Sequence, residues 1–374
     1  MKFLRTILPV PLIVGVALSS PVYANHDRDD DAHAVFVMTN DADSNEIIAY
    51  RRNPYGTLFA PHHFKTEGRG SGGKGDPLAS QGSLTLSQDG QWLFAVNAGS
   101  GTLSVFRVEG ESLFLTDRIA TGGAEPTSVT QRANFVFVLN AAGSSSVVGF
   151  SFHNGHLSEL AHSQGFLSAN GANPGSIDFT ADGKFLIATE KAGNKLDTFA
   201  VGPNGQLSQV KVTASVGPGA FAANAVGSGL VLVSETGSGG NTSALSSYHL
   251  LNDGSLTPVS TSVPTLGAAN CWNAVTPNGH FIYVSNAGTS TIAGFSISAS
   301  GSLTPVPGTI VGTNPTGATN LDIAVSADGK FLYSLNSGSG TIGAFAINPD
   351  GSLTALGSIP GLSAGSSLNG IVAN

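Results

Sequence analysis

Two glutamates, Glu190 and Glu235, are the residues of this sequence best suited to catalysis. Each ends an apolar run, and five related runs end instead in an asparagine: Asn40, Asn97, Asn140, Asn286 and Asn336. Matching positions in neighbouring repeats are expected to lie side by side, which places the two carboxyl groups near one another. A like charge raises the pKa of one member of such a pair, as general acid–base catalysis requires.

These strand ends also have a structural interpretation. An asparagine side chain can cap the backbone of a turn, so asparagine is the default residue there. Glu190 would then form a salt bridge at the rim with Lys191 or Lys195. The sequence leaves both interpretations open.

The repeating unit that positions these residues is clearest in residues 326–356, SADGKFLYSLNSGSGTIGAFAINPDGSLTAL. Its apolar runs alternate with turns that contain Asp-Gly or a Gly/Ser-rich stretch, as strands and tight turns do. A further short run of small residues precedes most copies. Four short strands in each period of ~50 residues indicate a β-propeller, and seven copies indicate seven blades.

The two ends of the repeat predict how the ring closes. The first copy starts at Val35 without an inner strand, whereas residues 367–374, SLNGIVAN, resemble an inner strand without a blade. We therefore predict an all-β chain: a seven-bladed β-propeller of four-stranded antiparallel blades over residues 34–374. The C-terminal strand completes blade one, so that no sheet edge stays open.

The first 24 residues are predicted to be a secretory signal peptide. Lys2 and Arg5 precede an apolar run at 7–18, and Val-Tyr-Ala ends the segment. The run is short for a membrane span and contains two prolines. Residues 25–33, NHDRDDDAH, are charged and lack large apolar side chains, which predicts a disordered acidic tail. The protein is therefore expected in the periplasm or outside the cell.

Composition narrows the possible partners. The net charge is −8 and charged residues make up 11% of the chain, so nucleic acid and anionic membranes are not expected partners. The sequence contains no metal or cofactor motif, so none is predicted, and we expect a monomer. The one cysteine, Cys271, cannot form an internal disulfide, and a small buried side chain is favoured over a nucleophile there.

One face of the propeller is the expected site of any ligand. The connections that enter the inner strands share this face with the Asn and Glu strand ends. Glu125 lies in one such connection, Lys191 follows a strand end, and Trp272 stands beside Cys271 at a strand mouth. A tryptophan ring there can wall a pocket or stack on a sugar. Trp92 falls inside a strand pattern and is expected in the core.

Residues 53–78 form the largest irregularity and are predicted to be a long loop over one face. Its GRGSGGKG stretch at 68–75 resembles a phosphate-binding loop but lacks the Ser or Thr hydroxyl that holds the metal, and no helix follows it. Arg69 in this loop is expected to deliver a positive charge to a ligand.

Blade motifs carry a resemblance to a known family. S-x-D-G-[KQ]-[FW]-L-[YF]-x-[VL]-N at 87–97 and 326–336, with G-S-L-T-P at 254–258 and 301–305, resembles the lactonase-type seven-bladed propellers. That family includes 6-phosphogluconolactonase-like enzymes and carboxymuconate cyclases. The resemblance implies rim His, Arg and Glu residues acting on anionic substrates. Only the Glu positions find counterparts, at Glu190 and Glu235, and no arginine follows Arg132. A less charged substrate is therefore implied.

Two functions follow as expectations. The first is an exported lactonase-like enzyme that hydrolyses a neutral lactone or sugar derivative at the central rim. Glu190 and Glu235 would activate water, and Lys191 or Arg69 would polarise the carbonyl group. The second is a non-catalytic propeller that presents its rim to a partner protein, a glycan or a small ligand.

Overall fold

The computed structural model describes Met1, residues 33–227 and residues 229–374. The predicted signal peptide and nearly all of the predicted acidic tail lie outside the described residues. From His33 onward the described chain forms one compact unit. No helix in this part of the chain has the length and apolar character that a membrane crossing requires.

The described residues form seven antiparallel sheets, each built from an inner, a second, a third and an outer strand. The inner strands are β29 (Ile371–Ala373), β4 (Leu84–Leu86), β8 (Ala124–Arg132), β13 (Pro174–Phe179), β17 (Ala220–Val226), β21 (Asn270–Val275) and β25 (Asn320–Val325). The second strands are β1 (Ala34–Met38), β5 (Trp92–Asn97), β9 (Phe135–Ala142), β14 (Phe185–Glu190), β18 (Leu230–Glu235), β22 (Phe281–Asn286) and β26 (Phe331–Asn336).

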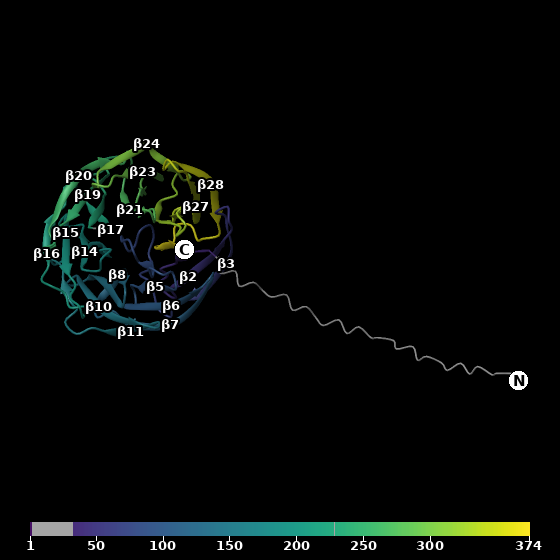
Figure 1. The fold of residues 1–374 in the computed structure, drawn as a ribbon, viewed down its shortest axis with the longest axis horizontal. Helices are drawn as coiled ribbons and strands as arrows, with labels where there is room; N and C mark the ends of the chain where they lie inside the picture. The colour runs from purple at the N-terminus through teal and green to yellow at the C-terminus, as the bar shows by residue number, and fades with distance from the viewer. Residues whose placement is uncertain (2–32, 228) are drawn as a thin grey trace. The chain divides into compact units, whose positions relative to one another are not determined.

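The third strands are β2 (Glu46–Arg52), β6 (Thr102–Glu109), β10 (Ser146–His153), β15 (Lys195–Ala200), β19 (Ala244–Leu250), β23 (Thr291–Ile297) and β27 (Thr341–Ile347). The outer strands are β3 (Leu58–Lys65), β7 (Ser112–Ala120), β11 (His156–Glu159) with β12 (Gly165–Phe166), β16 (Lys211–Ala214), β20 (Leu256–Pro264), β24 (Leu303–Thr313) and β28 (Leu353–Pro360). The sheets surround a common centre, with outer strands such as β7, β16 and β24 at the periphery (Figure 1). The predicted seven-bladed propeller is therefore confirmed.

Closure of the ring occurs as predicted. β29 pairs with β1, so that Val37 faces Ile371 and Val35 faces Ala373. The Met38 amide also donates to the Gly370 carbonyl at 3.1 Å. The C-terminal strand thus completes blade one and covers an edge that would otherwise expose its backbone groups.

Side chains join the inner strands of neighbouring blades. Ser176 Oγ on β13 accepts a hydrogen bond from the Ala223 amide on β17 at 2.9 Å, and Asp178 Oδ2 accepts one from the Ala225 amide at 2.9 Å. On the other side, Ser128 Oγ accepts from the Ile177 amide at 3.1 Å. Short polar side chains suit these strands because they satisfy backbone amides that no ladder reaches.

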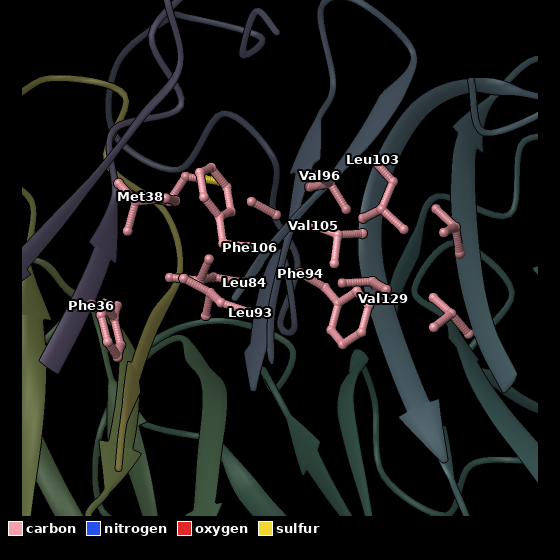
Figure 2. Packing of buried hydrophobic residues seen from close by; sticks show 14 of the residues in the cluster. Phe36, Met38, Leu84, Leu93, Phe94, Val96, Leu103, Val105, Phe106 and Val129 are labelled. Carbon is pink, nitrogen blue, oxygen red and sulfur yellow. The ribbon is translucent and has the colours of Figure 1, made fainter. Parts of the chain in front are cut away.

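The hydrophobic core lies between the sheets. Each third strand has an aromatic ring at the same position of the repeat, and all seven of these rings are buried: Tyr50, Phe106, Phe150, Phe199, Tyr248, Phe295 and Phe345. Figure 2 shows Phe106 of blade two among side chains from β1 and β5, with Phe36 and Phe94 nearby. The repeated ring of the sequence therefore marks the position where one blade packs on the next.

One sequence expectation needs correction. Residues 53–78 were expected to form a single long loop, but β3 (Leu58–Lys65) lies within this range and is the outer strand of blade one. Five consecutive side chains of β3 are exposed, so its residues lack the apolar alternation that marks a half-buried strand. Pro61 weakens the strand pattern further, because proline has no backbone N–H to donate to a neighbouring strand. It is tolerated here because β3 is an edge strand.

Ring closure predicts a strong effect at the last strand. Ile371 is 2% exposed, and Ile371→Ala is expected to lower the free energy of unfolding by about 2–4 kcal/mol because it leaves a cavity at the closing sheet. Leu356→Ala, on the exposed surface of β28, is the control and is expected to change it by about 0.5 kcal/mol or less. Urea unfolding measures both. Equal effects of the two substitutions would contradict a stabilising role for closure.

Candidate functional site

Three strand-end asparagines use their side chains to hold the connection that enters their own blade. The carbonyl oxygens of Asn97, Asn140 and Asn286 accept hydrogen bonds from three threonine hydroxyls, Thr66, Thr121 and Thr265, at 2.6, 2.8 and 2.9 Å. Each threonine lies in the segment that leads into the blade of its partner. The face that carries these residues is called the strand-end face below.

Glu190 is fully buried, and its carboxylate holds the connection that enters blade four. Its Oε1 accepts hydrogen bonds from Ser168 Oγ at 3.0 Å and from the Ala169 amide at 3.1 Å. Lys195 Nζ lies 3.8 Å from Oε2. Lys195 is thus the ion-pair partner among the two lysines that the sequence offered.

A second carboxyl group stands beside Glu190. Asp197 on β15 is two residue pairs further along the ladder, opposite Ala188, while Glu190 pairs with Lys195. Burial raises the pKa of Asp197 to about 7, and the charge of the nearby Glu190 carboxyl group adds to the shift. The like-charge neighbour of Glu190 is therefore Asp197 of its own blade. The sequence analysis missed Asp197 because no other blade has a carboxylate at this position.

Glu235 is also fully buried, in blade five. Its Oε1 accepts hydrogen bonds from Ser246 Oγ at 2.7 Å and from the Gly217 amide at 2.9 Å, and its Oε2 accepts one from Ser262 Oγ at 2.9 Å. Burial raises the pKa of Glu235. Within the described chain, none of the hydrogen-bond partners of Glu235 contacts Glu190. The catalytic role of the two glutamates stays a prediction, and substrate would reach either one only if a connection moved.

The centre of the strand-end face is occupied by residues 76–82, the axial segment. Ser80 Oγ donates to the Thr127 carbonyl and the Gln81 amide donates to the Gly175 carbonyl, both at 2.8 Å. Blade six reaches the segment through Trp272, and blade one does so through Asn369. The axial segment thus bonds to blades on different sides of the ring.

Four of the sequence-predicted ligand-binding residues meet at this segment. Lys191 Nζ donates to the Ala79 carbonyl and lies 4.8 Å from the centroid of the Phe221 ring. Trp272 packs edge-to-face on Phe221 with centroids 5.1 Å apart, and its Nε1 donates to the Ser80 carbonyl at 2.9 Å. Trp272 is fully buried, so its indole ring packs inside the protein and holds the axial segment through this hydrogen bond. Of the remaining two, Cys271 lies in one buried cluster with Trp272, against which Ala79 packs, and the charge of Glu125 acts on Lys191.

Burial sets the electrostatics of this cluster. It lowers the pKa of Lys191 to about 8, against the opposing effect of three nearby acidic groups: Asp76, Cys271 and Glu125. It raises the pKa of Asp76 to about 6, an effect that Lys191 partly offsets. Burial also raises the pKa of the Cys271 thiol, which keeps it protonated and disfavours a nucleophilic role.

Asp76 is a functional candidate that the sequence analysis did not single out. Its Oδ1 accepts hydrogen bonds from the Ala79 amide at 2.9 Å and from Asn369 Nδ2 at 3.2 Å. Among the described residues, Oδ2 has no hydrogen-bond partner. The signal available in the sequence was its place in the long irregular segment between blades one and two.

Arg69 lies apart from the cluster. Its side chain is exposed, and its backbone amide donates to Ser100 Oγ of blade two at 3.0 Å. It is not among the groups whose charge acts on Lys191. Within the described chain, no group of three or more His, Cys, Asp or Glu side chains is placed to hold a metal ion.

A central channel of about 480 Å³ lies along the inner strands. Gln81 and Gly82 of the axial segment form part of its wall. Asp178 and Asp322 also line it, and burial raises the pKa of Asp178 to about 6 and that of Asp322 to about 7. Both carboxylates accept backbone hydrogen bonds from the inner strand of the next blade. Their position serves the packing of the inner strands.

The Asp197–Glu190 pair predicts a pH effect on stability. Because the pKa of Asp197 is raised from 3.8 to about 7, the folded chain holds a proton that the unfolded chain releases. This contribution to the free energy of unfolding is complete below pH 3.8 and is lost as the pH rises through about 7. Asp197→Asn removes the titration, so the variant is expected to gain stability relative to the original chain between pH 4 and pH 7.5.

Urea unfolding at several pH values measures this difference. Asp253→Asn is the control, and its stability difference is expected to change with pH in the opposite direction. The hydrogen bond from Lys211 lowers the pKa of Asp253, whereas the pKa of Asp197 is raised. A stability difference for Asp197→Asn that does not change with pH would contradict the raised pKa of Asp197.

About one third of the chain matches a known protein family. Residues 204–321 match the model of the family described as Lactonase, 7-bladed beta-propeller. A search of curated proteins finds no match to the chain.

Solved structures resemble nearly the whole chain. A candidate 6-phosphogluconolactonase from Bacteroides fragilis is 18% identical with a TM-score of 0.66, over 92% of this chain and 98% of its own. The periplasmic gluconolactonase of Pseudomonas aeruginosa is 20% identical with a TM-score of 0.67, over 90% of this chain and 98% of its own. Identities this low establish the fold alone. The chain is therefore a seven-bladed β-propeller, and its predicted resemblance to the lactonase family is confirmed over residues 204–321.

Proposed function

We propose that this protein hydrolyses a neutral lactone or a related sugar derivative at the centre of the strand-end face. One observation carries the proposal: Lys191 and Asp76 lie together there, and burial moves their pKa values to about 8 and about 6. At pH 7 the lysine is then mostly charged and the aspartate mostly ionised. A general acid and a general base are most effective when their pKa values lie near the working pH.

The two groups can divide the chemistry of lactone hydrolysis. The Lys191 ammonium would donate a hydrogen bond to the lactone carbonyl oxygen and stabilise the negative charge that develops on it. The free Oδ2 of Asp76 would accept a proton from the attacking water. The ring C–O bond then breaks, and the leaving oxygen takes up a proton to give a hydroxy acid. Water supplies the added oxygen, so no other reactant is needed.

The charge of the cluster favours a neutral substrate. Lys191 is its one basic side chain, and two carboxyl groups, Asp76 and Glu125, act on it. Anionic substrates usually require several cationic side chains, and arginine is the common choice. Arg69, which the sequence offered for this purpose, lies exposed beside blade two. An uncharged lactone would bind without adding a third negative charge.

Substitution of Lys191 tests this assignment. Lys191→Met is expected to lower kcat for a neutral lactone by about a hundredfold or more, because the carbonyl oxygen loses its charged donor. Lys184→Met is the matched control, since Lys184 is exposed and pairs with Asp182 in an Asp-Gly turn outside the cluster. Assays over a panel of aldonolactones, with unfolding curves for each variant, measure both. Full activity of a folded Lys191→Met variant would refute the assignment.

The pH profile tests the second group. The rate is expected to rise as Asp76 ionises around pH 6 and to fall as Lys191 loses its proton around pH 8. Asp76→Asn should abolish the acid limb and leave the alkaline limb in place. The double variant Glu190→Gln, Glu235→Gln separates this assignment from the prediction made on the two strand-end glutamates. Loss of activity in that variant, with an intact fold, would move the catalytic site to the glutamates.

A non-catalytic propeller is the second candidate. The axial segment fills the centre of the strand-end face, and both strand-end glutamates are fully buried. On this view the chain binds a glycan, a small ligand or a partner protein without turnover. Binding of a lactone by calorimetry, with no hydrolysis of any lactone in the panel, would favour this function.

Export is part of the proposal. Its support is the basic and apolar pattern of residues 1–24, together with the periplasmic description of the similar Pseudomonas aeruginosa protein. The full chain expressed in a Gram-negative host is expected outside the cytoplasm with Asn25 as its first residue, and deletion of residues 2–24 should retain it inside. N-terminal sequencing of fractionated cells measures this. An intact N-terminus on the exported protein would contradict the cleavage site.

A further inference from the structure

The chain contains its own example of a guanidinium group bound between two blades. Arg52, the last residue of β2, reaches from blade one to blade seven. Its NH2 nitrogen lies 3.1 Å from Asp328 Oδ2, and its guanidinium carbon lies 5.0 Å from the centroid of the Phe331 ring. The Arg52 side chain is 1% exposed. An aspartate in an Asp-Gly turn and a ring three residues later thus form a guanidinium site.

The same framework recurs between blades two and three. Asp89 and Trp92 stand at the positions of Asp328 and Phe331 in the repeated motif. In both turns the preceding serine donates to the aspartate, at 2.5 Å from Ser87 and 2.6 Å from Ser326.

A glycine of the following blade lies against the ring in both places. A β-carbon on Gly56 would be 2.4 Å from a carbon of the Phe331 ring, and one on Gly155 would be 2.5 Å from a carbon of the Trp92 ring. The two interblade sites therefore have the same construction.

The cation is missing from the second site. In blade three the residue that corresponds to Arg52, two positions after the core ring, is Phe152. Phe152 packs edge-to-face on Trp92 at 5.3 Å. Asp89 has no ion-pair partner within the described chain. In the turn of blade four, by contrast, Asp182 pairs with Lys184 at 3.1 Å. Gln91 occupies the corresponding position in blade two and carries no charge.

A pocket of about 570 Å³ opens at the second site. Its lining includes Asp89 and Trp92 from blade two, with Gln131, Asn134, His153 and Asn154 from blade three, and it contains no lysine or arginine. The Gln131 Oε1 atom is buried without a hydrogen-bond donor. The pocket therefore offers a carboxylate, an indole ring and the amide side chain of Gln131, which together suit a planar cation with several donors.

We propose that this pocket binds a guanidinium group, supplied by an arginine side chain of a partner or by a free guanidino compound. Asp89 would accept its hydrogen bonds, Trp92 would lie against the cation, and Gln131 Oε1 would take a further donor. A guanidinium offers five N–H donors in one plane, and tryptophan is the best aromatic partner for a cation. The site is separate from the Lys191–Asp76 cluster and does not depend on the lactonase proposal.

Titration of the full-length mature protein tests the proposal. The probes are Nα-acetyl-argininamide, its neutral analogue Nα-acetyl-citrullinamide, and a short peptide with one central arginine. The readout is tryptophan fluorescence, because Trp92 lines the pocket while Trp272, the other tryptophan, is fully buried. We expect a weak, saturable change with argininamide and none with citrullinamide, because the cation–π and carboxylate contacts require the charge. Tighter binding of the peptide assigns the site to a protein partner, and equal binding assigns it to a free guanidino compound.

Variants locate the binding. Asp89→Asn keeps the fluorophore and is expected to weaken argininamide binding by roughly threefold or more. Asp182→Asn, in the lysine-paired turn of blade four, is the matched control and should bind like the original protein. Phe152→Arg places an arginine where Arg52 stands in blade one and is expected to abolish binding by filling the pocket. Failure of argininamide to give a saturable signal would overturn the proposal. Equal affinities for Asp89→Asn and the original protein would do the same.

Discussion

The pairing of β29 with β1 is the constraint on which the structure depends. A propeller has no core of its own in any single blade, because each sheet buries its faces only against its neighbours. Closure gives every sheet two neighbours, so that the inner strands line the centre and the outer strands form the periphery of the ring. The inner strands then lie close enough for single side chains such as Ser176 and Asp178 to bond across blades. The channel and the strand-end face are consequences of that geometry.

At the strand ends, a side-chain amide or a carboxylate can fill the same structural role. An asparagine in this position uses its carbonyl oxygen to hold a threonine of the incoming connection. Glu190 and Glu235 hold serines and backbone amides in the same way. Full burial of a carboxylate is costly unless hydrogen bonds satisfy it. The several donors around Glu235 meet this need, and Glu190 meets it in part with Ser168 Oγ, the Ala169 amide and the nearby Lys195 ammonium.

The sequence predicted the fold because the fold is periodic, and it predicted the site less well because the site is not. The strand-end residues and the core rings recur in every copy of the repeat, so comparison of the copies revealed their positions in the fold. The inner strand that is missing before Val35 is matched by the extra strand at the C-terminus, which revealed how the ring closes. β3 was hidden because an exposed edge strand with Pro61 lacks the apolar alternation of its counterparts. Asp76 and Asp197 have no equivalents in other blades. The sequence predicted Lys191, Glu125, Cys271 and Trp272 on one face, but only coordinates show that the axial segment joins Lys191 and Trp272.

The axial segment has a consequence for the order in which the protein can fold. The ribosome completes residues 76–82 early, yet their partners Gly175, Trp272 and Asn369 follow up to 293 positions later. Until blade six and the last strand exist, this segment has no complete set of hydrogen bonds. The centre of the strand-end face therefore assembles only after synthesis ends, and an exported chain would finish it on the far side of the membrane. Long-range contacts of this kind slow folding and prolong exposure of the partly built ring.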